Sequence, residues 1–362
     1  MTGSLAGTSW QLPWYGRMAW ENLLRSPFEQ DLTIAFCMDD ADRNTQSETP
    51  CEVYMYVGEK TDSGDDLARA GLTNGTLLGM RVWVDGVQRT DESNDFGFGA
   101  SSYVGSAEFT WHDFGDVSGM TGVQLQTEPK AQGVFRMQRI EDGAWDTRAG
   151  HENSFYFVTT ANMTTNSRLW KMIFDDITNP GAGGTIEILL NGAEGYRMAD
   201  NICFDRAGNV IIQEDAGGND RLGKVWQYDT ATGALTEIAA HDAYRFLPGG
   251  SSFLTNDEES SGVIDAEEVL GPGYLLLDVQ AHYNIGDTEL AEDGRLLALF
   301  NPDTFWIRTA DHNQDGAVNT LDVLSFLNAW NARRPETDYN RDGSINTSDV
   351  SAYLNDWAVS RD

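Results

Sequence analysis

Residues 201–240 read NICFDRAGNVIIQEDAGGNDRLGKVWQYDTATGALTEIAA, and this stretch decides the class of fold. It divides into four short apolar runs of strand length, which are separated by the turn sequences AGN, AGGND and TATG. Gly, Asn and Asp favour tight turns, and no helical periodicity runs through the stretch. The sequence therefore predicts four short strands that follow one another along the chain.

Other parts of the chain repeat this pattern of apolar runs and polar turns. Units of this kind recur at about the 40 to 50 residues that separate the blades of a propeller. An all-β propeller is therefore the predicted fold, and a β-sandwich is the alternative. The further predicted strands lie at 53–60, 77–84, 155–160, 168–174, 185–190, 274–282 and 296–300.

The charge of the chain limits its partners. The sequence has 362 residues, of which 57 are acidic and 24 are basic, so the formal net charge is −33. Such a surface repels nucleic acids and anionic membrane surfaces, whereas it attracts cations. Adaptation to salty surroundings is the other explanation for the charge. Because 40% of the residues are hydrophobic, the chain can still form a packed core.

No targeting or membrane segment is visible in the sequence. The first thirty residues lack the basic start and apolar run of a signal peptide. No apolar run approaches the ~18 residues that a membrane span needs. The three cysteines, Cys37, Cys51 and Cys203, match no metal-binding spacing, and a bridge between the first two remains open.

A repeat occupies the C-terminus. Residues 310–330 and 337–357 are identical at eleven of twenty-one aligned positions, at a constant offset of 27. Each copy contains the pattern D-x-N-x-D-G-x-x-N-x-x-D, which supplies oxygen ligands at the positions that a calcium loop requires. Apolar residues then recur at helical spacing, so one amphipathic helix is expected after each loop.

The repeat thus predicts two calcium loops, at 311–322 and 338–349. In each loop Asp and Asn side chains, one backbone carbonyl and a final Asp surround the ion. The predicted ligands are Asp311, Asn313, Asp315, Ala317, Asp322, Asp338, Asn340, Asp342, Ser344 and Asp349.

Two loops that each have only an exiting helix, with Asp at the twelfth position, resemble the dockerin module of secreted bacterial proteins. The resemblance covers residues 309–362 and implies a small all-α domain of two EF-hand-like loop-helix repeats. Dockerins bind two Ca²⁺ ions and dock onto a cohesin domain. They read that partner at loop positions 10 and 11, which are Thr320, Leu321, Thr347 and Ser348 here. The alternative is a calcium-folded cap that binds no protein.

Carboxylates and amides gather at predicted strand ends upstream of the repeat. In a propeller the strands nearest the axis end at the mouth of the channel, so several of these pairs can converge there. Converging carboxylates repel one another unless cations neutralise them, which predicts a site for several oxygen-ligated metals. For any one pair alone, a turn cap or solvated loop is the simpler interpretation. The groups are Glu21-Asn22, Asp39-Asp40, Glu141-Asp142, Asp200-Asn201, Glu214-Asp215, Glu258-Glu259 and Asp278 with Gln280 and His282.

Segments distributed over residues 10–302 resemble the PhoX-type alkaline phosphatases and their secreted relatives. The segments are AWEN (19–22), VYMYVGEK, AGLTNG (70–75), RIEDGAWD (139–146), SRLWKMIFDD, DNICFDRAGNVIIQED, DEESSGVID and LLLDVQAH. The resemblance implies a β-propeller over residues 1–308. It also implies that the channel mouth holds Ca²⁺ and Fe³⁺ ions and hydrolyses a phosphate ester substrate.

The same resemblance implies roles for individual residues. Glu21 and Glu141 match metal-ligating carboxylates of the family, and Arg139 matches the arginine that holds the substrate phosphate. A planar guanidinium suits that role because it can bind two phosphate oxygens at once. Arg139 and Glu141 are therefore the predicted catalytic residues. The further candidate ligands are Asp200, Asn201, Glu214, Asp215, Glu259, Gln280 and His282, although an Ala separates the last two where the family has a Gln-His pair.

The beginning of the chain departs from the family. Family members carry a long N-terminal half with an iron-binding cysteine in an Arg-Phe-Cys-Ser-like segment, and none of the three cysteines stands in such a segment. Met1 is therefore expected to lie inside the family's domain. The propeller would then be N-terminally truncated and its ring incomplete.

Two functions follow from the sequence. The first is a metal-dependent phosphoesterase, extracellular or periplasmic by family resemblance, that attaches through its dockerin. The alternative is a non-catalytic, calcium-stabilised propeller that serves as a surface or scaffold interaction protein. A glycoside hydrolase finds little support, because nothing beyond abundant carboxylates suggests the paired acid and base of sugar hydrolysis.

Overall fold

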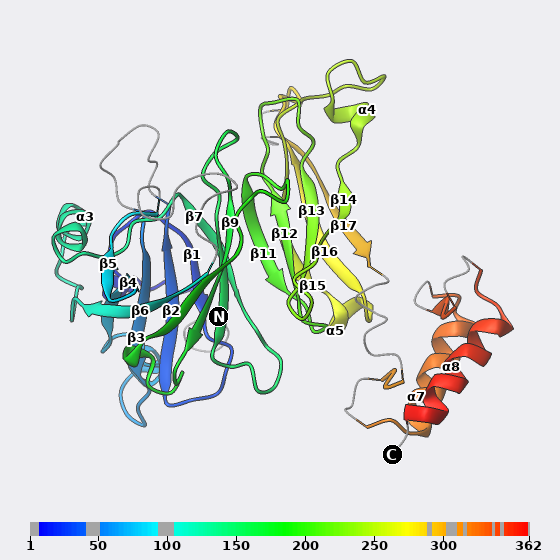
Figure 1. Ribbon diagram of the computed structural model, residues 1–362, viewed down its shortest axis with the longest axis horizontal. Helices are drawn as coiled ribbons and strands as arrows, with labels where there is room; N and C mark the ends of the chain where they lie inside the picture. Colours follow the sequence, from blue (N-terminus) through cyan, green and yellow to red (C-terminus); the bar gives the residue numbers. More distant parts are fainter. Residues whose placement is uncertain are drawn as a thin grey trace.

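The computed structural model describes most of the chain, and its described part consists mainly of β-strands with few helices (Figure 1). The strands form three sheets, and two helices stand at the C-terminal end. The described residues are 7–40, 51–92, 105–287, 292–301, 310–313, 317–334, 337–340 and 344–360.

The largest sheet has ten strands in the order β1-β2-β3-β4-β6-β10-β9-β8-β7, and β5 pairs with β4. All of its paired strands run antiparallel. Its strands are β1 (Trp20–Arg25), β2 (Leu32–Asp39), β3 (Val53–Glu59), β4 (Thr76–Val84), β5 (Val87–Arg89), β6 (Ser106–Asp113), β7 (Ile140–Trp145), β8 (Ser154–Thr159), β9 (Arg168–Phe174) and β10 (Gly184–Leu190).

This sheet nearly closes on itself, because β1 and β2 both contact β7. An aromatic core fills the space that it encloses. Phe36 of β2 stacks on Phe155 of β8 with ring centroids 3.9 Å apart, and Trp145 of β7 packs against Phe155 at 5.0 Å. These rings are buried, and Phe36 also lies 5.5 Å from Trp145, so the contacts join β2 to β7 where the sheet nearly closes.

The other two sheets follow in chain order and are also antiparallel. The second is β11 (Ala199–Phe204), β12 (Asn209–Glu214), β13 (Lys224–Asp229) and β14 (Leu235–Ala240), which confirms the four strands predicted for residues 201–240. The third is β15 (Glu258–Asp265), β16 (Tyr274–Ala281) and β17 (Asp293–Phe300). The remaining predicted strands are confirmed as well, since each coincides with a strand of the structure.

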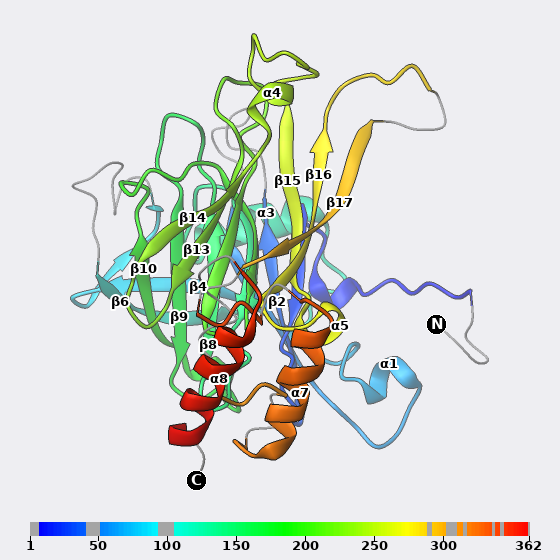
Figure 2. The ribbon, with the colours of Figure 1, turned by 90° about the vertical axis from the view of Figure 1, so that its right-hand side faces the viewer.

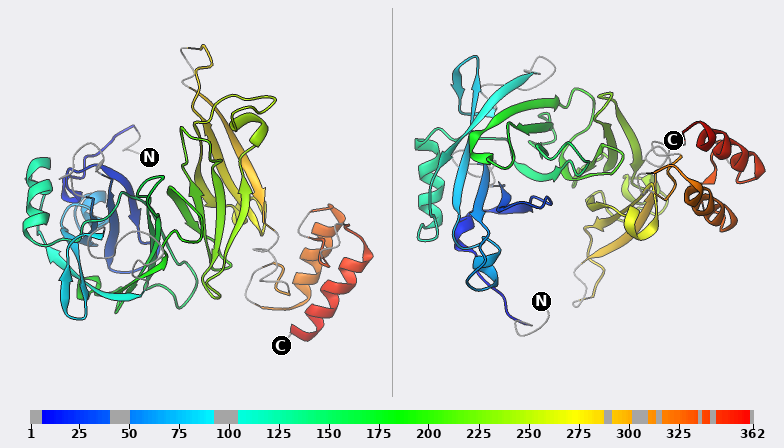
Figure 3. Two further views of the ribbon diagram at one scale, coloured as in Figure 1. Left: turned by 45° about the horizontal axis from the view of Figure 1, so that its top comes forward. Right: turned by 90° about the horizontal axis from the view of Figure 1, so that it is seen from below.

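The sheets stack one after another through apolar layers. Strand β7 contacts β11, and β11 contacts β15. Tyr156 and Leu169 of the first sheet pack against Ile212 of the second. Ile211, on the opposite face of β12, packs against Leu277 of the third sheet. Figure 3 shows the sheets in an open arc, an arrangement that resembles successive propeller blades more than the two facing sheets of a β-sandwich.

Helix α3 (Gly122–Ala131) is the longest helix upstream of the C-terminal repeat in the described residues, and the sequence did not predict it. It begins at Thr121 with a capping box that involves Gln124, and it buries Leu125 against the first sheet. Pro129 lies inside the helix and Val123 is exposed, so no apolar periodicity marks the segment. The short helices are η2 (Pro13–Tyr15), α1 (Asp66–Arg69), η3 (Pro180–Ala182), α4 (Ala243–Phe246) and α5 (Glu267–Leu270).

Helices α7 (Thr320–Asn331) and α8 (Thr347–Ser360) confirm the prediction that a helix follows each copy of the repeat. They lie side by side (Figure 2). Phe326 and Tyr353, which occupy the same position in the two copies, stack with centroids 4.0 Å apart. None of the described helices is long and apolar enough to cross a bilayer.

The two copies also exchange equivalent hydrogen bonds. The indole of Trp330 donates to the carbonyl of Asn346, which lies just before α8. Its counterpart Trp357 donates to the carbonyl of Asn319, which lies just before α7. The distances are 3.0 Å and 2.8 Å, so the repeat folds into a helix pair with approximate two-fold symmetry.

Candidate functional site

Strands β1, β7, β11 and β15 contact one another in turn, and we call them the innermost strands. The second residue of each is acidic. In β1, β7 and β11 the pairing register shifts at that residue, between Trp20 and Asn22, between Ile140 and Gly143, and between Ala199 and Ile202. Irregularities of this kind redirect side chains and are common beside functional sites. The four acidic residues are Glu21, Glu141, Asp200 and Glu259.

Three carboxylates from this region come together. Glu21, Asp40 and Glu141 can each direct one oxygen into a group whose atoms all lie within 4.8 Å of one another. Glu21 is exposed, Asp40 is half-buried and Glu141 is buried. Sequence reasoning named Glu21 and Glu141 as ligands, and it noted Asp40 only as one member of an acidic pair at the end of β2.

Arg139 completes this cluster. Its Nη2 lies 2.8 Å from Oε1 of Glu141 and 3.3 Å from Oδ2 of Asp40. The residue has a φ of 58°, a left-handed conformation that non-glycine residues rarely adopt. Burial lowers the pKa of Arg139, but Glu141 and Asp40 outweigh that effect and raise the pKa above its ordinary value. The guanidinium is therefore a permanent positive charge among the carboxylates.

The carboxylates destabilise one another's charged forms. Burial raises the pKa of Glu141, and the nearby Asp200 and Asp40 raise it further, although Arg139 opposes them. Burial also raises the pKa of Asp200, with Glu259 and Asp215 as its main charged neighbours. Asp200 therefore electrostatically links the cluster of Glu21, Asp40 and Glu141 to a second acidic group.

A hard cation suits the donor set of the first cluster. Within the described residues, Oδ1 of Asp40 is buried and accepts no hydrogen bond. Oε1 of Glu141 likewise accepts none and has only the ion pair with Arg139. Buried carboxylate oxygens without donors are costly unless a cation pairs with them, and oxygen-only ligands fit Ca²⁺ and other hard metals. The arrangement is that of an acidic metal site.

The second acidic group surrounds a cavity of about 400 Å³. His282 lies at its edge, where Nδ1 is 2.6 Å from Glu292 and Nε2 is 3.5 Å from Glu259. Burial lowers the pKa of His282, but hydrogen bonds to these two carboxylates raise it overall. Gln280 donates to Oε1 of Glu259 at 3.2 Å. The cavity is lined by Met198, Asp215, Gly217, Asp257, Glu259, His282 and Glu292.

Glu214, another predicted ligand, lies outside both groups. It is fully buried at the end of β12, which is not an innermost strand. Its two oxygens accept hydrogen bonds from Arg221 at 2.6 and 3.0 Å, from the indole of Trp226 at 2.9 Å and from the backbone N–H of Arg197 at 2.8 Å. These donors satisfy the carboxylate, so Glu214 links the segments that contain Arg197 and Arg221 to the end of β12.

Asn201 is also outside the cluster of Glu21, Asp40 and Glu141. Its Oδ1 accepts hydrogen bonds from Ser261 at 2.7 Å and from the backbone of Gly262 at 3.0 Å, which ties β11 to β15. Asp142 acts alike, because it accepts from the backbone of Ile202 at 3.1 Å and ties β7 to β11. Adjacent strand residues point to opposite sides. In Glu141-Asp142 and Asp200-Asn201 the first member therefore belongs to the acidic groups, and the second member links neighbouring strands.

One signal in the sequence could have identified the main acidic residues. Glu141, Asp200 and Glu259 follow one another at intervals of 59 residues, and so do the residues two places before them. The preceding residues are Arg139, Met198 and Asp257, and the last two line the acidic cavity. Glu21 lies outside this interval, and Asp40 and Glu292 have no comparable signal.

The predicted calcium loops are described in part. Asp322 and Asp349 are fully buried at the starts of α7 and α8. Each holds its loop in the same way: Asp322 accepts from the backbone of Asn313 and Asn319, and Asp349 accepts from Asn340 and Asn346. Asp311, Ala317, Asp338 and Ser344 are described in the same loops, whereas Asp315 and Asp342 lie outside the described residues.

The four residues at loop positions 10 and 11 form the first turns of the two helices. Thr320 and Leu321 begin α7, and Thr347 and Ser348 begin α8. Leu321 is 56% exposed. These residues therefore lie at the surface of the helix pair, at the ends that the loops approach.

Comparisons with known proteins support the fold alone. No protein-family model matches the sequence, and no curated protein sequence matches it. Among solved structures, the chain is similar to PhoX of Pseudomonas fluorescens, which was solved in complex with vanadate, a transition state analogue. The match has a TM-score of 0.53 and 14% sequence identity, and it covers 81% of this chain and 55% of that protein. The chain thus has a PhoX-like, β-rich fold and spans about half the length of this structural neighbour.

Proposed function

We propose that the chain hydrolyses phosphate monoesters with the help of metal ions at the cluster of Glu21, Asp40, Glu141 and Arg139. The observation that carries the proposal is the position of one guanidinium within 3.3 Å of two carboxylates that have buried, unsatisfied oxygens. The PhoX-like fold adds support, since the neighbour binds a transition state analogue. The sequence segments that resemble the PhoX family include Arg139 and both Glu residues.

Glu21, Asp40 and Glu141 would hold a metal ion, and Asp200 stands close enough to raise the pKa of Glu141. Family resemblance favours Ca²⁺ and Fe³⁺ as the ions. A bound metal of this kind polarises phosphoryl oxygens and activates water for attack. Without it, a phosphate dianion would meet several carboxylates, so these residues alone disfavour substrate binding.

Arg139 would hold the phosphate. A guanidinium can donate to two phosphate oxygens and balances charge that develops on them. Glu141 and Asp40 orient Arg139 through the contacts at 2.8 and 3.3 Å. The half-exposed position of its side chain, with 24% of the area accessible, lets a ligand approach it. In this proposal the chain supplies no covalent nucleophile.

For the fold, we propose that β1–β4, β7–β10, β11–β14 and β15–β17 are blades of an incomplete propeller that extends over residues 1–308. The contacts of β7 with β11 and of β11 with β15 support this assignment.

The test is hydrolysis of p-nitrophenyl phosphate by the full chain with Ca²⁺ and Fe³⁺ supplied. Arg139→Ala should lose at least about 100-fold in kcat/KM, because one oriented donor to the transition state contributes about 3 kcal/mol. Arg206→Ala is the matched control, since Arg206 lies on the surface and pairs with Glu268. Equal inactivity of all three proteins with metal bound would refute the proposal.

We further propose that residues 309–362 form a dockerin that binds two Ca²⁺ ions and attaches the chain to a cohesin-type partner outside the cell. The paired helices, the equivalent roles of Asp322 and Asp349 and the exposed Leu321 support this proposal. Calorimetry should find about two calcium sites in residues 309–362, in addition to any ion held by Glu21, Asp40 and Glu141. Asp322→Ala together with Asp349→Ala should abolish both, and retention of both in that variant would contradict the assignment.

A non-catalytic, calcium-stabilised interaction protein is the second candidate function. The specific observation in its favour is that the chain covers only 55% of the PhoX neighbour, so a site that is complete there need not be complete here. Metal binding at Glu21, Asp40 and Glu141 without turnover of any phosphate monoester would favour this function.

A further inference from the structure

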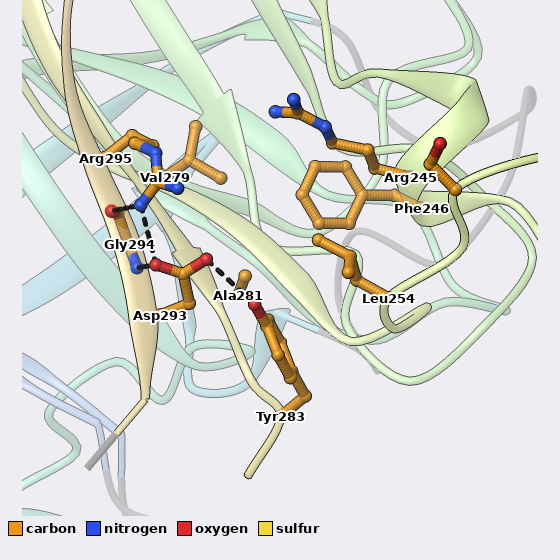
Figure 4. Close-up of a pocket in the computed structure, with 10 residues that line it drawn as sticks. Arg245, Phe246, Leu254, Val279, Ala281, Tyr283, Asp293, Gly294 and Arg295 are labelled. Atoms are coloured by element: carbon orange, nitrogen blue, oxygen red, sulfur yellow. Dashed lines mark hydrogen bonds and ion pairs between the residues drawn. The ribbon is translucent and has the colours of Figure 1, made fainter. Parts of the chain in front are cut away.

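A second cavity lies near the acidic one but differs from it in character. It has a volume of about 290 Å³ and lies between the loop that contains α4 and the ends of β16 and β17 (Figure 4). Side chains alternate along β16, so Gln280 and the following His282 serve the acidic group while Val279 and Ala281 line this cavity. The two cavities therefore use opposite faces of one strand end.

The walls of this cavity are partly apolar. Phe246 of α4 and Ala281 are buried, whereas Leu254 is 40% exposed on the rim. Figure 4 shows Phe246 and Leu254 together on one side of the cavity and Val279 across from them. An apolar group of ring size would cover Leu254 and contact Phe246, which favours binding.

Two arginines give the cavity a positive character that is unusual in this acidic chain. Arg245 and Arg295 both line it, and their side chains are 55% and 62% exposed. Among the described residues, the ion-pair partner of Arg245 is Asp242, at 3.5 Å. Arg295 contacts Asp293 at 2.6 Å, and Asp293 is the one carboxylate among the described residues of the lining. Each guanidinium has five N–H donors, so both retain donors for a ligand.

Tyr283 fixes the position of the wall carboxylate. Its hydroxyl donates to Oδ2 of Asp293 at 2.9 Å, while Arg295 donates to Oδ1 at 2.6 Å. Hydrogen bonds from Tyr283 and Arg295 lower the pKa of Asp293, so it remains charged and holds Arg295 in place. Asp242, which pairs with Arg245, lies outside the lining, so two guanidiniums and one carboxylate line the cavity itself, and this balance favours a single negative charge.

We propose that this cavity binds a small organic monoanion with an aromatic body, of the aromatic carboxylate class. The anion would lie between Arg245 and Arg295, and the ring would lie against Phe246 and Leu254. This binding site is independent of the metal cluster and of any phosphatase activity.

The test is isothermal titration of the full chain with 2-naphthoate and with its neutral counterpart 2-naphthalenemethanol. We expect saturable binding of one 2-naphthoate per chain and at least about 10-fold weaker binding of the alcohol, because a charge-assisted hydrogen bond contributes that much. The double variant Arg245→Gln, Arg295→Gln should weaken 2-naphthoate at least about 10-fold. Leu254→Ala should weaken both compounds.

Two further variants test whether 2-naphthoate binds in this cavity. Arg206→Gln removes another exposed arginine outside the cavity and should bind 2-naphthoate as the wild type does. Absence of saturable binding, equal affinity for the acid and the alcohol, or unchanged affinity in the double variant would each overturn the proposal. Loss of binding in Arg139→Ala would also overturn it, since the anion would then sit at the metal cluster.

Discussion

At the scale of single residues, neighbours in the sequence have different tasks. Glu141 belongs to the cluster with Glu21 and Asp40, whereas Asp142 accepts a hydrogen bond from the backbone of Ile202. The alternation of side chains along β7 separates the roles of these two neighbours. The sequence indicated that the acidic pairs converge, but it could not assign Glu214, because its partners Arg221 and Trp226 become neighbours only in the folded chain.

Glu214→Gln tests that structural role. The change removes the charge that holds Arg221 and leaves one buried acceptor fewer for Trp226, so we expect a loss of about 2 kcal/mol in the free energy of unfolding. Denaturant unfolding in chelator and with added metal measures it. The loss should be the same in both conditions. A loss that appears only with metal present would make Glu214 a ligand after all.

The raised pKa of Asp39 predicts how the stability of the protein depends on pH. Burial raises its pKa to about 8, and Asp40 contributes, although the backbone of Ala19 donates to it and opposes the shift. A carboxyl whose pKa is higher in the folded state stabilises the protein at low pH. Its contribution is complete below the unfolded pKa of about 4 and is lost as the pH rises through about 8. The metal-free protein should therefore melt at a lower temperature at pH 8.5 than at pH 5.

Asp39→Asn is the control for this pH effect. The amide oxygen can still accept from the backbone of Ala19, but the group no longer titrates. The melting temperature of this variant, measured in chelator, should fall less between pH 5 and pH 8.5 than that of the wild type. An equal fall in both proteins would mean that other groups cause the pH dependence.

At the scale of elements, the bulge in β7 positions Glu141, and Gly143 permits it. A Cβ atom at Gly143 would lie 2.4 Å from the ring of Phe155 and 2.9 Å from the carbonyl of Tyr156, which is too close. Gly143→Ala should therefore cost about 1 to 3 kcal/mol of stability and shift the strand that carries Glu141. Gly119→Ala is the matched control, because a Cβ there meets nothing within 4 Å.

The readout for Gly143→Ala is metal affinity at a temperature where both variants are folded. We expect weaker binding of the metal ion at the cluster in Gly143→Ala and unchanged binding in Gly119→Ala. Unchanged affinity in Gly143→Ala, despite lower stability, would show that the position of Glu141 does not depend on this bulge.

The hydrogen bonds between the two C-terminal copies predict that a change in one helix affects calcium binding in the loop of the other copy. Trp330 of α7 supports the loop before α8, and Trp357 of α8 supports the loop before α7. Each replacement by Phe removes one hydrogen bond, so each should weaken one calcium site by about 1 kcal/mol, and the weakened site is that of the other copy. Calcium titrations followed by circular dichroism measure this. An effect on the variant's own copy would contradict the exchange.

The sequence predicts most elements of this fold because strands separated by Gly and Asn turns are local patterns. Helix α3 was not predicted, because Leu125 and Pro129 are its only buried residues and Val123 is exposed, so its sequence shows no apolar periodicity. Its position depends on the tertiary contact of Leu125 with the first sheet. In the same way Asp40 reaches Glu141 only because β1 and β2 contact β7, a pairing that no local pattern encodes.

At the scale of the whole molecule, the third sheet exposes apolar side chains, among the described residues, on its face away from the second sheet. Leu277 of the third sheet is buried against the second sheet. On the opposite face, Ile264 pairs with Leu276 and is 54% exposed, and Leu296 pairs with Asp278 and is 77% exposed. Exposed apolar faces of a sheet promote association between molecules.

This face predicts self-association that rises with concentration despite the net charge of −33. High salt screens the charge repulsion, so the association should increase with salt. Leu296→Lys places a charge on the exposed edge strand β17 and should reduce the mass measured by light scattering toward that of a monomer. Val123→Lys changes an equally exposed residue on α3 and should leave the mass unchanged. A monomeric wild type at high salt and high concentration would instead mean that this face remains solvated without a partner.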